Sequence, residues 1–151
     1  MTAYMPKAKS IEWETPQDLF DRMDQEYHFT LDVCASKKNA KCKRYYNKKQ
    51  DGLKQSWEGV CWMNPPYGLQ IKGWVKKAYE ESQKGAMVVC LLPVRSDTGW
   101  FHDYIYDEKN NTFKKGVECR LLRGRLKFGK NGKQPSTVPS MIVVFRAKHN
   151  S

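Results

Sequence analysis

The chain has 151 residues, of which 40% are hydrophobic and 13% aromatic, and its 27 Lys and Arg outweigh its 16 Asp and Glu to give a formal net charge of +11. This length favours one domain, and this composition excludes a disordered chain. The positive charge favours a polyanionic partner, nucleic acid before a membrane surface. A basic protein kept soluble by its charge is the alternative.

Residues 1–10 are expected to form a basic tail ahead of a single domain over residues 11–147. The tail lacks the apolar core of a signal peptide, and the longest apolar run, "AMVVCLLPV", is too short to cross a bilayer. We therefore expect a cytoplasmic protein that does not bind a membrane. Five cysteines with no C-x-x-C pair and three scattered histidines favour reduced cysteines and no metal site.

The first predicted element is an amphipathic helix in "TPQDLFDRMDQEY", with Thr15 as its cap, Pro16 in its first position and Asp18 completing a capping box. A short strand in "FTLDVCA" is expected to end near Asp32. A second strand is predicted in "AKCKRYYN" and a third in "GVCWMN", where prolines stop it.

A second helix is predicted from Gln70 to Lys84, because its apolar residues recur at helical spacing and Gly85 follows as a cap. "AMVVCLL" reads as a strand buried on both faces, "SDTGWFHDYIY" as a capped helix and "DEKNNTFKKG" as a polar loop. Strands in "VECRLL" and "MIVVF" flank a basic connection rich in Gly and Pro.

This order predicts an α/β fold with a mainly parallel sheet, an antiparallel edge and flanking helices. Ligands of such sheets bind beyond the carboxyl ends of the strands. Asp32 and Asn64 both stand at predicted strand ends, so we expect them in one crevice.

The stretch "NPPYG" after the third predicted strand suits the chemistry of an exocyclic amine. Such an amine is a poor nucleophile because its lone pair is delocalised into the ring. The side-chain oxygen of Asn64 and the carbonyl of Pro65 could accept its two N–H hydrogens, while Pro66 stiffens the turn. Tyr67 offers a face for a base, a contact worth about 1–3 kcal/mol. The alternative is a rigid turn with no chemistry.

"NPPY" resembles the [DNS]-P-P-[YF] motif of amino-methyltransferases that use S-adenosylmethionine. Blocks from "WETPQDLFDRMDQEYHFTLDVCA" through "DGL", "CWMNPPYG" and "VVCLLPVRSDTGWFH" to "RGRLKFG" and "PSMIVVF" are similar to the phage-type DNA adenine-N6 methyltransferase family. The resemblance covers roughly residues 13 to 145 and implies a trimmed Rossmann-like methyltransferase fold.

The resemblance also implies roles for particular residues. It gives the catalytic motif as Asn64, Pro65, Pro66 and Tyr67. It gives the cofactor-binding residues as Thr15, Pro16, Asp32, Ala35, Asp51 and Asn64, with Asp32 and Ala35 near the methionine end of the cofactor and Asp51 near its adenine. The sequence departs from many such enzymes because "DVCASKKNA" has no glycine. Asp32 could otherwise be a turn carboxylate, Asp51 a turn residue and Thr15 a cap.

DNA is the expected partner, and its phosphates are expected to meet basic residues near the motif. The candidates are Lys72, Arg123, Arg125, Lys127, Lys130 and Lys133, with a solvated basic surface as the alternative. With no room for a recognition domain, a short or relaxed target sequence is predicted. The rival hypotheses are methylation of RNA or of a protein glutamine, and a nucleic-acid-binding protein that has lost catalysis.

Overall fold

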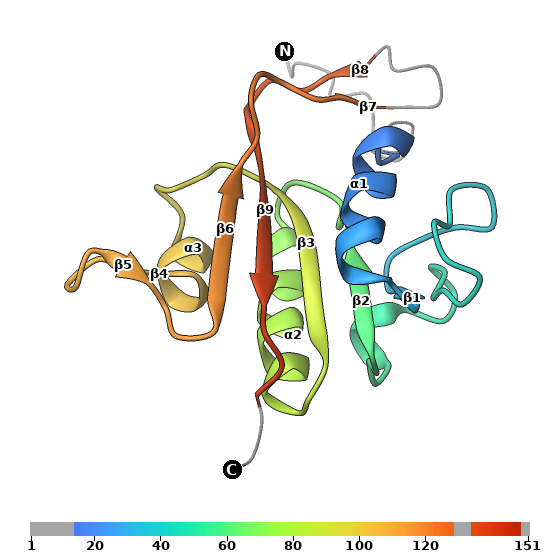
Figure 1. The fold of residues 1–151 in the computed structure, drawn as a ribbon, viewed down its shortest axis with the longest axis horizontal. Coiled ribbons are helices and arrows are strands. Elements are labelled where there is room, and N and C mark those ends of the chain that lie inside the picture. The colour runs from blue at the N-terminus through green and yellow to red at the C-terminus, as the bar shows by residue number, and fades with distance from the viewer. Residues whose placement is uncertain (1–13, 129–133, 149–151) are drawn as a thin grey trace, which may run out of the picture.

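The computed structural model describes residues 14–128 and 134–148 (Figure 1). The predicted basic tail over residues 1–10 lies outside the described residues, as do Lys130 and Lys133.

A five-stranded sheet forms the centre of the described fold (Figure 1). Its strands, in spatial order, are β1 (Leu31–Asp32), β2 (Val60–Met63), β3 (Met87–Pro93), β9 (Ser140–Phe145) and β6 (Val117–Leu121). The pairings β1–β2 and β2–β3 are parallel, whereas β9 runs antiparallel to both β3 and β6. The predicted α/β class is confirmed, and the sheet is mixed.

The last two strands form an antiparallel side of the sheet, in which β9 is internal and β6 is the edge strand. All six residues of β9 are buried, whereas β6 is only half-buried and ends in an exposed residue. A fully buried strand is stabilised by neighbours on both sides, and β9 lies between β3 and β6.

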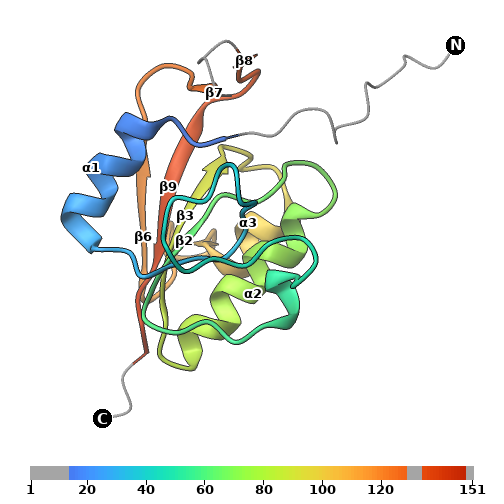
Figure 2. The same cartoon turned by 90° about the vertical axis from the view of Figure 1, so that its right-hand side faces the viewer.

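Among the described residues, three helices cover the two faces of the sheet (Figures 1 and 2). The helix α1 (Gln17–Tyr27) packs on one face, and α2 (Ile71–Gln83) and α3 (Gly99–Tyr104) pack on the other, with a single 3-10 turn, η2 (Gly52–Lys54), beside α2. The apolar faces predicted for the first two helices are confirmed, because they bury Leu19, Phe20, Met23, Tyr27, Ile71, Trp74, Val75 and Ala78.

Three local predictions are wrong. The cap position of α1 is Pro16, which leaves Thr15 outside the helix, and no side chain caps the helix. "AKCKRYYN" forms only an isolated bridge between Tyr45 and Asp32, because the exposed Lys43 and Arg44 interrupt its apolar residues. "DEKNNTFKKG" is not a plain loop but contains most of a small hairpin of β4 (Tyr106–Asp107) and β5 (Thr112–Phe113). Contacts of the Tyr106 ring with neighbouring aromatic rings stabilise this hairpin.

A second small hairpin stands in the connection between β6 and β9. It pairs β7 (Lys127–Phe128) with β8 (Gln134–Pro135). Figure 1 shows this hairpin above the first turn of α1. The hairpin therefore lies at the edge of the sheet where β1, β2 and β3 end.

Candidate functional site

The carboxyl ends of β1 and β2 lie side by side. Asp32 pairs with Trp62, and the backbone N–H of Val33 donates to the carbonyl of Trp62 at 3.1 Å. Asn64 follows Trp62 by two residues. The parallel register thus brings Asp32 and Asn64 to the same edge of the sheet, and their sharing one crevice stays a prediction.

Asn64 is held by a residue 49 positions earlier in the chain. Its side-chain Nδ2 donates to Oγ1 of Thr15 at 2.9 Å, and Thr15 is buried. The bond fixes the plane of the Asn64 amide and therefore the direction of its oxygen. It also explains why Thr15 does not cap α1.

The remaining motif residues form a partly buried turn after β2. Pro65 is buried, Pro66 and Tyr67 are partly buried, and Gly68 has a φ of 109°, a conformation that favours glycine. The ring of Tyr67 meets the ring of Phe128 edge-on, with centroids 6.0 Å apart. Phe128 belongs to β7, so the basic connection packs directly on the motif.

Burial raises the pKa of Tyr67 well above its ordinary value, and a hydrogen bond with Ser140 acts in the opposite direction. The phenol therefore stays protonated near neutral pH. Tyr67 can contribute its ring and a neutral hydroxyl to the site, and it cannot supply a phenolate base.

Asp32 is a buried carboxylate with two backbone partners. Its side chain is nearly inaccessible, Oδ1 accepts the N–H of Cys34 at 3.3 Å, and Oδ2 accepts the N–H of Lys41 at 3.0 Å. Burial raises its pKa from 3.8 to about 6, although both hydrogen bonds act to lower it. Asp32 thus fixes the loop that follows β1.

This raised pKa predicts a pH dependence of folding. The folded state binds the Asp32 proton more tightly than the unfolded chain, so the stabilisation is complete below about pH 3.8 and is lost as pH rises through about 6. A difference of about two pH units corresponds to roughly 3 kcal/mol. The test is urea unfolding of the parent protein and of Asp32→Asn at several pH values from 4 to 7. As the pH rises, the free energy of unfolding of the parent should fall more than that of the variant. Parallel profiles would contradict the assignment.

Asp51 and Gly52 pack against the loop after β1. Asp51 has a φ of 57° and its carboxylate accepts the N–H of Leu53 at 3.0 Å, which starts the turn η2. A Cβ on Gly52 would lie 2.1 Å from the carbonyl oxygen of Val33. Burial and Asp32 raise the pKa of Cys34 most, Lys48 lowers it, and Asp51 lies close enough to add a smaller increase. The predicted segments "DVCA" and "DGL" are therefore in direct contact.

The other predicted cofactor residues, Pro16 and Ala35, lie next to Thr15 and in the loop after β1, respectively. Pro16 follows Thr15 at the start of α1, and Ala35 is half-buried, with its N–H donating to the carbonyl of Tyr46 at 3.0 Å. The structure thus brings together the segments that hold Thr15, Asp32, Asp51 and Asn64. Sequence patterns gave no signal for the bond between Thr15 and Asn64 or for the packing of Phe128 on Tyr67.

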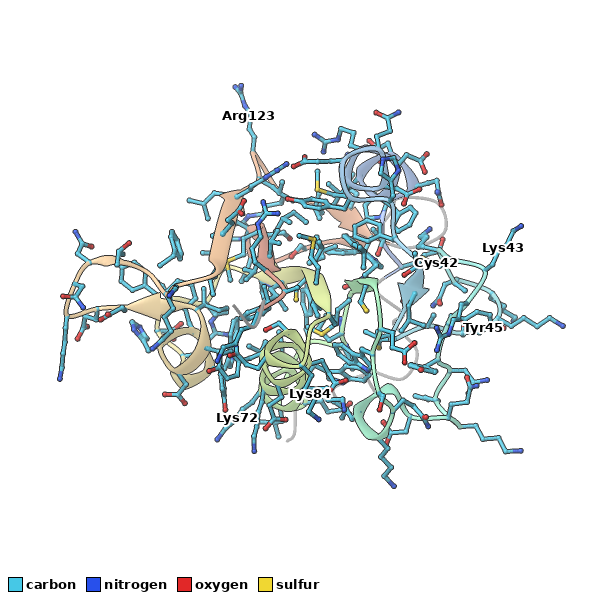
Figure 3. All side chains as sticks on the ribbon, turned by 60° about the horizontal axis from the view of Figure 1, so that its bottom comes forward. Cys42, Lys43, Tyr45, Lys72, Lys84 and Arg123 are labelled. Carbon is cyan, nitrogen blue, oxygen red and sulfur yellow. The ribbon has the colours of Figure 1, made fainter. Side chains whose placement is uncertain are left out.

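The predicted DNA-binding residues that the structure describes are exposed. Lys72 lies on α2, Arg123 and Arg125 lie between β6 and β7, and Lys127 lies on β7. Figure 3 shows Arg123 projecting away from the protein. Lys77 of α2 and Lys84, which follows the helix, both pair with the carboxylate of Glu81.

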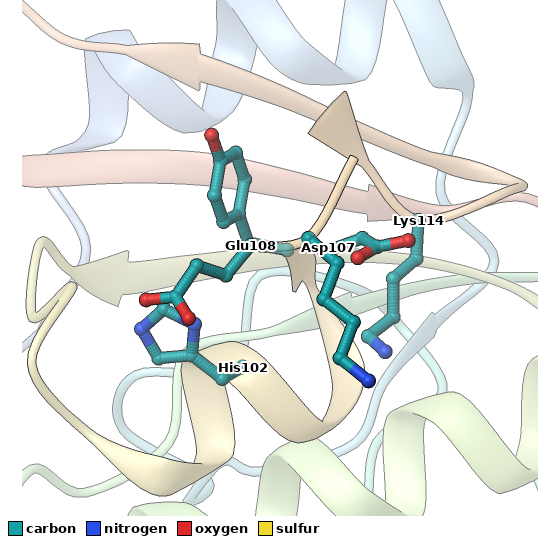
Figure 4. Close-up of a pocket in the computed structure, with 6 residues that line it drawn as sticks. His102, Asp107, Glu108 and Lys114 are labelled. Carbon is teal, nitrogen blue, oxygen red and sulfur yellow. The ribbon is translucent and has the colours of Figure 1, made fainter. Parts of the chain in front are cut away.

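A cavity of about 380 Å³ lies elsewhere, between α3 and the β4–β5 hairpin (Figure 4). Its lining residues are His102, Tyr106, Asp107, Glu108, Lys109 and Lys114. None of them belongs to the predicted site. Within residues 14–128 and 134–148, no cluster of His, Cys, Asp or Glu suits a metal ion, and no helix is long and apolar enough to cross a membrane.

The fold and the site define an α/β protein with an amide-and-proline turn at the end of a central strand. The chain matches the family model for DNA N-6-adenine-methyltransferase (Dam) over residues 2–150, and it belongs to this family. The family predicted from the sequence is thereby confirmed.

Two phage proteins, each named DNA N-6-adenine-methyltransferase, are similar to the chain. The protein of Haemophilus phage HP1 is 29% identical over 143 residues, which cover 90% of this chain and 79% of the relative. The protein of Escherichia phage T1 is 32% identical over 99 residues, which cover 64% of this chain and 41% of the relative. The chain therefore spans most of the first relative and less than half of the second.

Proposed function

We propose that this protein transfers a methyl group from S-adenosylmethionine to the N6 amine of adenine in DNA. Membership of the DNA N-6-adenine-methyltransferase family supports the reaction. The observation that carries the proposal for this chain is the Asn64 amide, which Thr15 holds at the end of β2, beside the turn that contains Pro65. We further propose a short or relaxed recognition sequence.

The role of the motif is to orient the amine. The Asn64 oxygen and the Pro65 carbonyl accept the two N–H hydrogens, so that the nitrogen lone pair is directed away from them. The bond from Asn64 to Thr15 keeps the amide from rotating, and Pro65 and Pro66 limit movement of the turn. Neither an amide nor a protonated Tyr67 is a strong base, so the surplus proton leaves to water after transfer.

The residues proposed for the cofactor suit its charges. S-adenosylmethionine, when bound, supplies an electrophilic methyl group on a positively charged sulfur. Asp32 places a carboxyl group at this edge of the sheet, where it favours the positively charged groups at the methionine end of the cofactor. We propose that Thr15, Pro16, Asp32, Ala35, Asp51 and Asn64 line its site, with Asp51 toward the adenine.

Access to the site requires the target base to leave the duplex stack or to be single-stranded already. We propose that Lys72, Arg123, Arg125 and Lys127 hold nearby phosphates, together with Lys130 and Lys133, which lie outside the described residues. These contacts carry little sequence information.

We propose a single domain over residues 11–147 with a trimmed Rossmann-like methyltransferase fold. The strand order β1-β2-β3-β9-β6, with two parallel pairings at the β1 side, supports this fold. Because both relatives are phage proteins, we place the activity in the cytoplasm of a bacterial host.

Label transfer from tritiated S-adenosylmethionine to DNA, RNA and protein in parallel tests the proposed function. We expect label in DNA alone. Label in RNA or in a protein glutamine would show that the acceptor is not DNA. Cofactor binding without any transfer would favour a protein that has lost catalysis.

Tyr67 should act through its ring. We expect Tyr67→Phe to keep most of the activity, because the ring and its packing on Phe128 remain. Tyr67→Ala should weaken the use of DNA by roughly tenfold or more, because a base–aromatic contact is worth about 1–3 kcal/mol. Steady-state kinetics on both variants check this, and equal losses would point to the hydroxyl instead.

A further inference from the structure

The loop that follows β1 is one of two strongly basic segments without an acidic residue, the other being residues 119–151 with eight Lys and Arg. Residues 33–50 contain seven of the 27 Lys and Arg residues and none of the 16 Asp and Glu residues. The rest of the chain carries 20 cations against 16 anions. An ordinary solvated surface mixes both signs, so a segment with seven cations and no anion requires its own explanation.

Two turns in this loop are built alike, and each presents a pair of adjacent lysines. In the first, the N–H of Ser36 donates to Oδ1 of Asn39 at 2.7 Å, and the N–H of Asn39 donates to Oγ of Ser36 at 3.3 Å. These reciprocal bonds enclose Lys37 and Lys38, which are both exposed.

The second turn repeats the arrangement. The N–H of Asn47 donates to Oε1 of Gln50, and the N–H of Gln50 donates to Oδ1 of Asn47, both at 2.9 Å. They enclose the exposed Lys48 and Lys49. The four side chains that close the turns are neutral and bond to backbone N–H groups. They fix the backbone around each lysine pair without neutralising its charge, so the ammonium groups can bind a partner.

The loop is anchored to the proposed active site. Asp32 accepts the N–H of Lys41, and the ammonium of Lys41 donates to the side chain of Gln17, in the first turn of α1, at 2.8 Å. The backbone of residues 44–46 bonds to Asp32 and Ala35. Figure 3 shows Lys43, in the middle of the loop, pointing outward. The cationic surface therefore borders the segments assigned to catalysis and cofactor binding.

We propose that the two lysine turns form a docking surface for the sugar–phosphate backbone of duplex DNA beside the target adenine. The inference rests on the proposed function, since it takes DNA as the substrate. A surface fixed by reciprocal hydrogen bonds loses less conformational entropy on binding than a mobile tail, which suits contacts that position a strand. Phosphates fit this surface because they match its charge without requiring base recognition.

The test replaces the lysines and leaves the turns intact. The variants are Lys37→Gln with Lys38→Gln, Lys48→Gln with Lys49→Gln, and all four together. The matched control is Lys115→Gln with Lys148→Gln, because both residues are exposed and lie just before β6 and just after β9, at the end of the sheet opposite to the carboxyl ends of β1, β2 and β3. The binding of each variant to a short duplex is measured by fluorescence anisotropy between 0.05 and 0.3 M salt.

Each lost phosphate contact should reduce the slope of log affinity against log salt by about 0.9. We expect the slope to fall by roughly 1 to 2 for each pair and by more for the fourfold variant. The KM for DNA should rise while kcat and the affinity for S-adenosylmethionine stay as in the parent. The control should match the parent in all four measures.

A parental slope and KM in the fourfold variant, or an equal change in the control, would overturn the inference. Either result would leave methyl transfer to DNA by the parent protein unaffected. A failure of the docking inference can therefore be distinguished from a failure of the proposed function. That failure would be seen as an absence of transfer to DNA by the parent protein itself.

Discussion

Replacing Asn64 by Ala is expected to reduce methyl transfer by a factor of about a thousand or more. The substitution removes one of the two acceptors that orient the amine, and loss of a single aimed hydrogen-bonding group typically costs about 10²–10³ in rate. It also removes the bond to Thr15, so the strand end loses its tether to the segment before α1. The affinity for S-adenosylmethionine should change far less, because several other residues are proposed to bind it.

Asn64→Asp is the matched variant for this prediction. It keeps an acceptor oxygen in nearly the same place but cannot donate to Thr15, and the related [DNS]-P-P-[YF] motifs include Asp at this position. We expect it to retain much more activity than Asn64→Ala in single-turnover kinetics, with cofactor binding followed by calorimetry. A fully active Asn64→Ala protein would refute the assigned role.

Replacing Gly52 by Ala is expected to destabilise the protein and to impair cofactor binding. A Cβ at this position would lie 2.1 Å from the backbone oxygen of Val33 and 3.1 Å from the ring of Trp74. Because a backbone oxygen cannot move aside alone, the turn at Asp51 and the loop after β1 must separate. Overpacking of this kind costs typically about 1–3 kcal/mol and sometimes more.

Gly73→Ala is the matched control for Gly52→Ala. Gly73 lies inside α2, and a Cβ there would meet nothing within 4 Å. Ala is favoured over Gly in a helix, so this variant should gain about 0.5–1 kcal/mol. Urea unfolding and calorimetry with S-adenosylmethionine on both variants test the pair. Equal stability of the two variants would contradict the close contact between the segments.

Local patterns were sufficient to predict the elements that bury a periodic apolar face. The first two helices and the strand in residues 87–93 follow directly from the spacing of their apolar residues. The two small hairpins were missed because each is only two residues long per strand and depends on ring contacts. The internal position of β9 depends on competition between strands for burial, which one segment does not reveal.

The site was predictable in its segments but not in its contacts. "NPPY" and the end of the strand at Asp32 lie at the same edge of the sheet. The bond from Asn64 to Thr15, the packing of Gly52 on Val33 and the packing of Phe128 on Tyr67 join residues far apart in the chain. Such contacts arise only once the sheet has formed, so Thr15 was read as a helix cap.

The central claim is that a fixed amide and a proline carbonyl present the adenine N6 amine to a sulfonium methyl group. The most direct test is to incubate the protein with tritiated S-adenosylmethionine and duplex DNA, digest the DNA to nucleosides and identify the labelled species. We predict label in N6-methyladenine, and label lost when Asn64→Ala replaces the parent. Label in a methylated cytosine, or no label in DNA at all, would contradict the account.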